Sequence, residues 1–130
     1  MRYAIVGTGS RHAMYREALV DHPIDASNEL VALCDSNRLR LELAASRVPR
    51  ARGRAVGVYP ADEFDRMIAE RRPDTIIVTT PDYLHDAYIV RALRAGCDVI
   101  TEKPMTIDLA RLKGIVDTQR ETGRSVTVTF

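Results

Sequence analysis

The chain has 130 residues, of which 45% are hydrophobic and 28% charged; this suits one soluble globular domain and excludes two domains, a disordered segment or a fibre. A formal net charge of +1 gives no general electrostatic reason to expect a nucleic acid or a membrane as a partner. No apolar run approaches the roughly 20 residues that cross a bilayer, and the first residues lack the charged-then-apolar pattern of a signal peptide, so we expect a cytoplasmic protein.

Strand and helix patterns alternate along the whole chain. Short apolar or β-branched runs predict parallel strands buried on both faces, and apolar residues spaced three and four apart predict amphipathic helices. In chain order, the predicted elements are a strand over 3–6, a helix over 11–22, a strand over 29–35, a helix over 37–47, a weak strand over 55–59, a helix over 61–72, a strand over 75–79, a helix over 82–95, a strand over 98–101, a helix over 107–122 and a strand over 125–130. Right-handed crossovers then predict a doubly wound α/β fold, a Rossmann-type parallel sheet of six strands in the order 3-2-1-4-5-6 with helices on both faces.

The positions of the prolines and the faces of the helices agree with this division of the chain. All six prolines fall at element boundaries, where they disturb neither a helix nor a central strand. In the helix over 37–47, the spacing places Leu39, Leu43 and Ala44 on one face. Residues 47–54 carry four arginines, but the proline and glycine among them favour a solvated loop over a basic patch.

The two cysteines carry little functional information. Cys34 and Cys97 lie far apart and show neither a CxxC motif nor a histidine at metal-ligand spacing. We therefore expect two small buried thiols, with no disulfide and no metal site.

A glycine loop follows the first predicted strand. It consists of Gly7, Thr8, Gly9, Ser10 and Arg11. The first glycine permits a tight turn, and the second lets backbone N–H groups approach a pyrophosphate at the start of the next helix. His12 replaces the third glycine of the usual fingerprint and is expected to be a surface residue of the first helical turn. The position of the loop predicts nucleotide binding; a turn that needs glycines only for its geometry is the alternative.

A carboxylate ends the second predicted strand. There, Asp35, followed by Ser36, can accept hydrogen bonds from the adenosine ribose and repel a 2′-phosphate, which favours NAD over NADP. Arg38 could instead pair with a 2′-phosphate, so NADP remains possible. The alternatives are that Arg38 is an exposed residue of the first helical turn and that Asp35 caps this helix.

Two further motifs follow the fourth and fifth predicted strands, at the edge where ligands bind in doubly wound sheets. Thr80, Pro81 and His85 belong to the sequence TTPDYLH, and Glu102 and Lys103 belong to EKP. A histidine in a first helical turn can equally satisfy a local structural need, so the residues alone leave the role of His85 open.

Lys103 is the candidate catalytic residue. The chain uses 17 arginines but only two lysines, Lys103 and Lys113. An ammonium beside a carboxylate can polarise a substrate oxygen and relay a proton, whereas a guanidinium stays protonated. The alternative is a surface lysine paired with Glu102.

Taken together, GTG after the first strand, TPDxxH after the fourth and EKP after the fifth resemble the Gfo/Idh/MocA family of NAD(P)-dependent sugar and inositol oxidoreductases. The resemblance covers residues 1–130, as one dinucleotide-binding domain. It implies that Thr80 and Pro81 pack against the cofactor, that His85 shapes its nicotinamide end, that Glu102 binds it by hydrogen bonds and that Lys103 lies between cofactor and substrate.

The resemblance also implies features outside these motifs. A cis peptide bond is expected before Pro104. A second α/β domain with an open antiparallel sheet is expected beyond Phe130, where it completes the substrate site and provides the surface through which family members form homo-oligomers.

The predicted function is hydride transfer between a nicotinamide cofactor and a sugar, polyol or related carbinol. Because the second domain supplies part of the substrate site, we expect residues 1–130 to bind the cofactor without efficient turnover. The alternatives are a non-catalytic module that senses NAD(P) and a methyltransferase, in which TPDxxH and EKP have no evident role.

Overall fold

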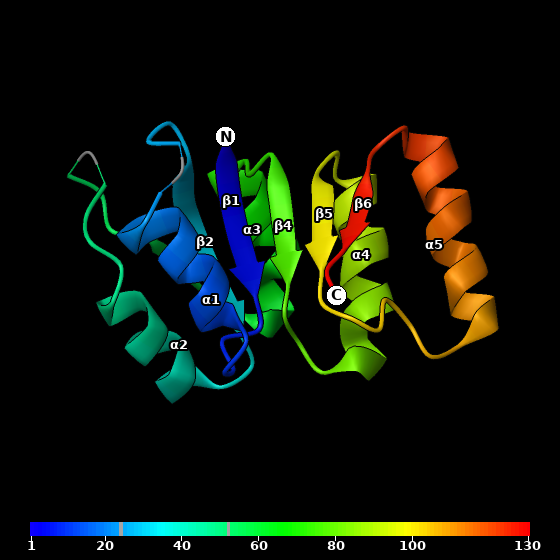
Figure 1. Ribbon diagram of the computed structural model, residues 1–130, viewed down its shortest axis with the longest axis horizontal. Coiled ribbons are helices and arrows are strands. Elements are labelled where there is room, and N and C mark those ends of the chain that lie inside the picture. The colour runs from blue at the N-terminus through cyan, green and yellow to red at the C-terminus, as the bar shows by residue number, and fades with distance from the viewer. Residues whose placement is uncertain (24, 52) are drawn as a thin grey trace.

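The computed structural model describes residues 1–23, 25–51 and 53–130, and within them strands and helices alternate (Figure 1). The strands are β1 (Arg2–Val6), β2 (Glu29–Asp35), β3 (Gly57–Pro60), β4 (Thr75–Val78), β5 (Asp98–Thr101) and β6 (Val126–Val128). The helices are α1 (His12–Arg16), α2 (Arg38–Ser46), α3 (Phe64–Arg71), α4 (His85–Arg94) and α5 (Leu109–Thr122), with a π-helical turn η1 (Glu17–Asp21) and 3-10 turns η2 (Ala61–Glu63) and η3 (Asp82–Leu84). All strand pairs in the described residues are parallel, in the order β3-β2-β1-β4-β5-β6, which confirms the predicted Rossmann sheet.

Alternate residues of the central strands pack into two apolar cores, one on each face of the sheet. In β1, Ala4 and Val6 join the core beneath α3 and α4, whereas Ile5 joins the core beneath α1 and α2 (Figure 1). Successive side chains of a strand point to opposite faces, so a strand covered by helices on both sides needs an unbroken apolar run. This is why the short run in β1 correctly predicted a central strand.

The predicted face of α2 was wrong. Leu39 and Leu43 are 77% and 57% exposed, and the buried residues are Leu41 and Ala44. The helix carries leucines around much of its circumference, so two stripes compete on spacing alone. The Asn37 side chain accepts a hydrogen bond from the N–H of Arg40 (3.0 Å) and caps the helix, and the stripe that faces the core from this start is the one through Leu41.

The helix predicted over 11–22 is α-helical only as far as Arg16 and then widens into the π-helical turn η1. The Arg16 side chain is buried and donates to the carboxylate of Asp21 (2.8 Å), five residues ahead. A π-helical turn brings residues i and i+5 together. The widening therefore accompanies the pairing of a buried guanidinium that periodicity did not reveal.

Cys34 and Cys97 are free and buried, as predicted. Burial, the larger cause, raises the pKa of the Cys34 thiol to about 12 and that of Cys97 to about 11. Neither thiol is therefore a nucleophile at neutral pH. Among the described residues, no helix has the length and apolar character needed to span a membrane.

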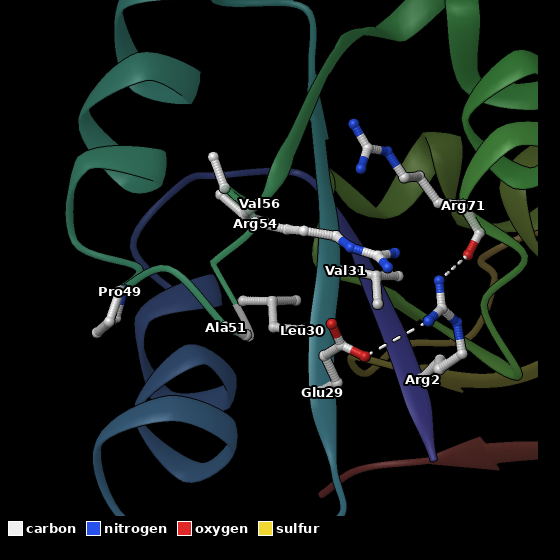
Figure 2. Close-up of a pocket in the computed structure, with 10 residues that line it drawn as sticks. Arg2, Glu29, Leu30, Val31, Pro49, Ala51, Arg54, Val56 and Arg71 are labelled. Carbon is white, nitrogen blue, oxygen red and sulfur yellow. Dashed lines mark hydrogen bonds and ion pairs between the residues drawn. The ribbon is translucent and has the colours of Figure 1, made fainter.

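A small cavity of about 30 Å³ lies at the amino end of the sheet, between β2 and the segment over 49–56 (Figure 2). Beside it, Arg2 donates to the carbonyl oxygen of Arg71 (2.6 Å) and pairs with Glu29 (3.4 Å). The volume suits about one water molecule, so this cavity cannot hold a nucleotide. The predicted loop over 47–54 runs past the cavity; Arg47, Arg50 and Arg54 are exposed, and Arg52 lies outside the described residues.

Candidate functional site

One continuous groove runs along the carboxyl ends of the strands. It consists of a hollow of about 410 Å³ between the glycine loop, the end of β2 and the segment after β4, and a hollow of about 420 Å³ between the segments after β4 and β5. Arg11, Thr79 and Thr80 line both hollows and join them. The groove crosses the place between β1 and β4 where the strand order reverses, which is where ligands bind in doubly wound sheets.

The groove brings the predicted site residues together. Those that line it are Gly7, Gly9, Ser10, Arg11, Asp35, Ser36, Thr80, Pro81, His85, Glu102 and Lys103. Thr8 is buried beneath it and bonds to Asp35. The Arg38 side chain is 88% exposed, as the alternative considered for it implies, and it pairs with Glu42 (2.7 Å). Both residues line a neighbouring hollow that shares Asp35 and Ser36 with the groove.

Glycine is needed at the two positions of the loop for different structural reasons. Gly7 has a φ of +94°, and a Cβ there would lie 2.6 Å from the backbone of Thr79 and Thr80, so the fold itself requires this glycine. A Cβ on Gly9 would meet nothing within 4 Å. Because Gly9 lines the groove, its missing side chain leaves open space that a ligand can use. This cradle fits a dinucleotide whose phosphates approach the loop backbone.

Two buried polar atoms at the loop have no hydrogen-bond partner among the described residues: Thr80 Oγ1 and His12 Nε2. Thr80 lines the groove, and its hydroxyl oxygen is buried just behind this lining. His12 contradicts the prediction of a surface residue, since it is only 8% exposed. Its Nδ1 bonds to the carbonyl oxygen of Gly9, which folds the ring back under the loop.

Asp35 connects the glycine loop to the end of β2. One carboxylate oxygen accepts hydrogen bonds from the N–H (2.5 Å) and the hydroxyl (2.7 Å) of Thr8. The other accepts from the N–H of Asn37 (2.7 Å) and from the guanidinium of Arg40 (3.1 Å). Asp35 does not cap α2, because Asn37 does so. The arginine that pairs with Asp35 is Arg40. The sequence analysis had considered only Arg38 at this position.

The hydrogen bonds around Asp35 make stability pH-dependent. Burial raises the pKa of this carboxyl, but the bonds from Asn37, Thr8 and Arg40 together lower it below its ordinary value. A carboxyl with a lowered native pKa stabilises the fold above its unfolded pKa, about 3.9, and loses this contribution as the pH falls through the native value.

We therefore expect Asp35→Asn to lower the free energy of unfolding at pH 7 and to change it much less near pH 2. Denaturant unfolding of both proteins between pH 7 and pH 2 measures the difference. A difference that stayed constant over this range would contradict an ionised, hydrogen-bonded Asp35.

Glu102 forms a second buried cluster in the other half of the groove. Its carboxylate accepts hydrogen bonds from Arg11 (3.0 Å), the hydroxyl of Tyr15 (2.7 Å) and the hydroxyl of Thr129 (3.2 Å). Burial raises its pKa, but the bonds from Tyr15, Arg11 and Thr129 together lower it, so the group is ionised at neutral pH. Tyr15 and Thr129 carried no sequence signal, since they reach Glu102 from α1 and from the segment after β6.

His85 joins the segments that follow β4 and β5. The side chain is 1% exposed, and its Nδ1 and Nε2 lie 2.8 Å from the carbonyl oxygens of Pro104 and Thr80 respectively. The Lys103–Pro104 peptide bond is cis, as the resemblance implied. His85 thus shapes this end of the groove by holding two loops together.

Lys103 lies exposed on the lining of the second hollow. It makes no ion pair with any part of the chain that the structure describes. The alternative of a surface pair with Glu102 does not occur, because Arg11 occupies that carboxylate (3.0 Å). The ammonium is therefore free to meet a ligand in the groove.

Comparisons with known proteins bear on the fold and on the family of the chain. A family model described as an oxidoreductase family with an NAD-binding Rossmann fold matches residues 1–130. The D-glucoside 3-dehydrogenase of Escherichia coli is 30% identical over 134 aligned residues, which cover 100% of this chain and 34% of that protein. Oxidoreductase ORF334 of Rhizobium meliloti is 29% identical over 127 residues, which cover 97% of this chain and 35% of that protein.

A solved structure shows the same fold. The WlbA dehydrogenase of Bordetella pertussis, in complex with NADH and UDP-GlcNAcA, matches with a TM-score of 0.83 and 26% identity, over 99% of this chain and 37% of that one. The chain thus spans about a third of the length of these relatives.

Proposed function

Because the chain belongs to the Gfo/Idh/MocA family of oxidoreductases and forms its NAD-binding Rossmann domain, we propose that the protein containing it transfers hydride between NAD and a secondary alcohol carbon of a sugar or polyol. The observation that carries the proposal is the groove of two adjoining hollows, which begins at the glycine loop and ends at Lys103, a residue with no ion-pair partner in the described part of the chain. NAD supplies the hydride acceptor or donor; the chain supplies binding, orientation and a proton.

The residues of the first hollow would hold the cofactor. The open face at Gly9 leaves the loop backbone accessible to phosphate, and Thr80 Oγ1 is a buried hydroxyl that still lacks a partner among the described residues. Ser10 and Arg11 continue the loop, and Ser36 and Pro81 border the hollow on either side. Gly9, Ser10, Ser36 and Pro81 line only this hollow, whereas Arg11 and Thr80 also line the hollow that contains Lys103.

The residues of the second hollow would hold the substrate oxygen. Lys103 can donate a hydrogen bond to this oxygen and exchange a proton with it as the alcohol and carbonyl interconvert. Since Arg11 pairs with Glu102 (3.0 Å), this carboxylate does not compete for the ammonium. His85 fixes the loop that carries Lys103 through the carbonyl oxygen of Pro104. A sugar or polyol is the favoured class because one relative, 30% identical to this chain, is a D-glucoside 3-dehydrogenase.

The first test separates binding from turnover. We expect residues 1–130 to bind NAD in calorimetric titrations and to catalyse no hydride transfer, because one domain lines only one side of a substrate site. The longer protein is expected to reduce NAD with a sugar or polyol, which a panel screened by NADH absorbance measures. Turnover by residues 1–130 at the usual enzyme rates, or NAD binding by neither protein, would overturn the proposal.

A further inference from the structure

The carboxylate at the adenosine end of the groove is already saturated by the chain itself. An ionised carboxylate offers about four lone-pair positions, and Asp35 receives four hydrogen bonds, two from Thr8 and one each from Asn37 and Arg40. Ribose hydroxyls that approach Asp35 must therefore displace one of these donors.

Arg40 is the donor that can leave. Thr8 donates from its backbone N–H and from its short hydroxyl side chain, and Asn37 donates from its backbone N–H. These donors are therefore held in place by the backbone. Arg40 reaches Asp35 through a long side chain that is 52% exposed and lines the groove. Displacing it requires a change of side-chain rotamer and no change in the fold.

The net charge at Asp35 is less negative than that of an isolated aspartate, because Arg40 pairs with it. The guanidinium of Arg40 (3.1 Å) offsets the negative charge that would repel a 2′-phosphate. Most of its five N–H donors are not engaged by Asp35, and a guanidinium binds phosphate through two parallel hydrogen bonds. The neighbouring carboxylate, Glu42, is paired with Arg38 (2.7 Å), and both residues line an adjoining hollow that shares Asp35 and Ser36 with the groove.

We propose that Arg40 is the residue that sets cofactor specificity, and that it makes the site accept NADP as well as NAD. The 2′-phosphate of NADP would bind the guanidinium of Arg40. The ribose hydroxyls of NAD must instead compete with this guanidinium for Asp35. This inference rests on the proposed dinucleotide site and adds to it a determinant of cofactor choice.

The test compares two probes on two variants. Calorimetric titrations with 2′,5′-ADP and 5′-AMP isolate the ribose end, and titrations with NADP and NAD report on the whole cofactor. For the unaltered chain we expect the dissociation constants of NADP and NAD to agree within about tenfold. In Arg40→Gln, loss of a charge-assisted pair should weaken NADP and 2′,5′-ADP by about 10- to 100-fold, with NAD unchanged or tighter.

Arg66→Gln is the matched control. Arg66 lies on α3, pairs with Glu63 and Glu70 on the surface and lines neither hollow, so its loss changes the net charge equally. It should leave the NADP to NAD ratio unaltered, and thermal melting confirms that each variant is folded.

Several outcomes would overturn the inference. They are a preference of the unaltered chain for NAD above about 100-fold, an equal loss of both cofactors in Arg40→Gln, and a loss of NADP binding in Arg38→Gln that Arg40→Gln does not share. In each of these cases NAD still binds and the proposed function stands. Failure of both cofactors to bind the unaltered chain would instead overturn the proposed function.

Discussion

Gly7→Ala is expected to destabilise the domain by about 2–5 kcal/mol, the combined cost of an unfavourable φ and of overpacking. The φ of +94° is rarely adopted by a residue with a side chain, and the new methyl group would lie 2.6 Å from backbone atoms of Thr79 and Thr80. The hydroxyl of Thr79 donates to the carbonyl oxygen of Gly7 (2.6 Å), so the clash also disturbs this buried bond. Denaturant unfolding of residues 1–130 measures the loss.

Gly9→Ala provides the comparison. A Cβ at Gly9 meets nothing within 4 Å, and its φ is not positive, so the free energy of unfolding should change by less than about 1 kcal/mol. The new methyl group enters the space left for the phosphates, and NAD binding should weaken by about tenfold or more. Equal stability losses in the two variants, or NAD binding that Gly9→Ala leaves intact, would contradict the separate roles assigned to the two glycines.

Lys103→Met in the longer protein is expected to lower kcat by about 10²- to 10⁴-fold, the usual contribution of a positioned acid or base. The dissociation constant of NAD should change far less, since the proposed cofactor site lies mainly in the first hollow. Lys103→Arg should not restore the rate, because a guanidinium cannot release its proton. Steady-state kinetics with saturating NAD, combined with calorimetry, distinguishes the two effects.

Lys113→Met is the control, because it removes the other lysine of the chain. Lys113 lies on the exposed side of α5 and pairs with Asp117 (2.5 Å), away from both hollows. The Lys113→Met variant should keep full activity. If Lys103→Met also kept full activity with NAD bound, the catalytic assignment would be wrong and a module that senses the cofactor would become the better explanation.

Hydrophobic periodicity and the positions of glycine and proline were enough to predict the parallel sheet, its strand order and the edge that carries the site. These features are local, and parallel sheets leave few topologies open once the elements are known. The positions of Gly7, Asp35 and Lys103 in the groove followed from the rule that strand ends meet at one edge.

The side-chain partners could not be predicted in the same way. Whether Arg38 or Arg40 reaches Asp35 depends on where α2 begins, and that is fixed by the cap at Asn37. Tyr15 meets Glu102 across a separation of 87 residues, which no local pattern records. His12 is buried because its ring bonds to a loop carbonyl, an interaction that depends on the loop conformation and not on residue type.

The anchoring of His85 has an evolutionary consequence. Both of its partners are main-chain carbonyl oxygens, those of Thr80 and Pro104, and every amino acid at those positions supplies the same acceptor. A single imidazole therefore holds the lysine loop in place whatever side chains surround it. Other lining residues such as Asp82 can therefore be exchanged during divergence, and the shape of the hollow can change, without loss of the bonds that hold the loop of Lys103.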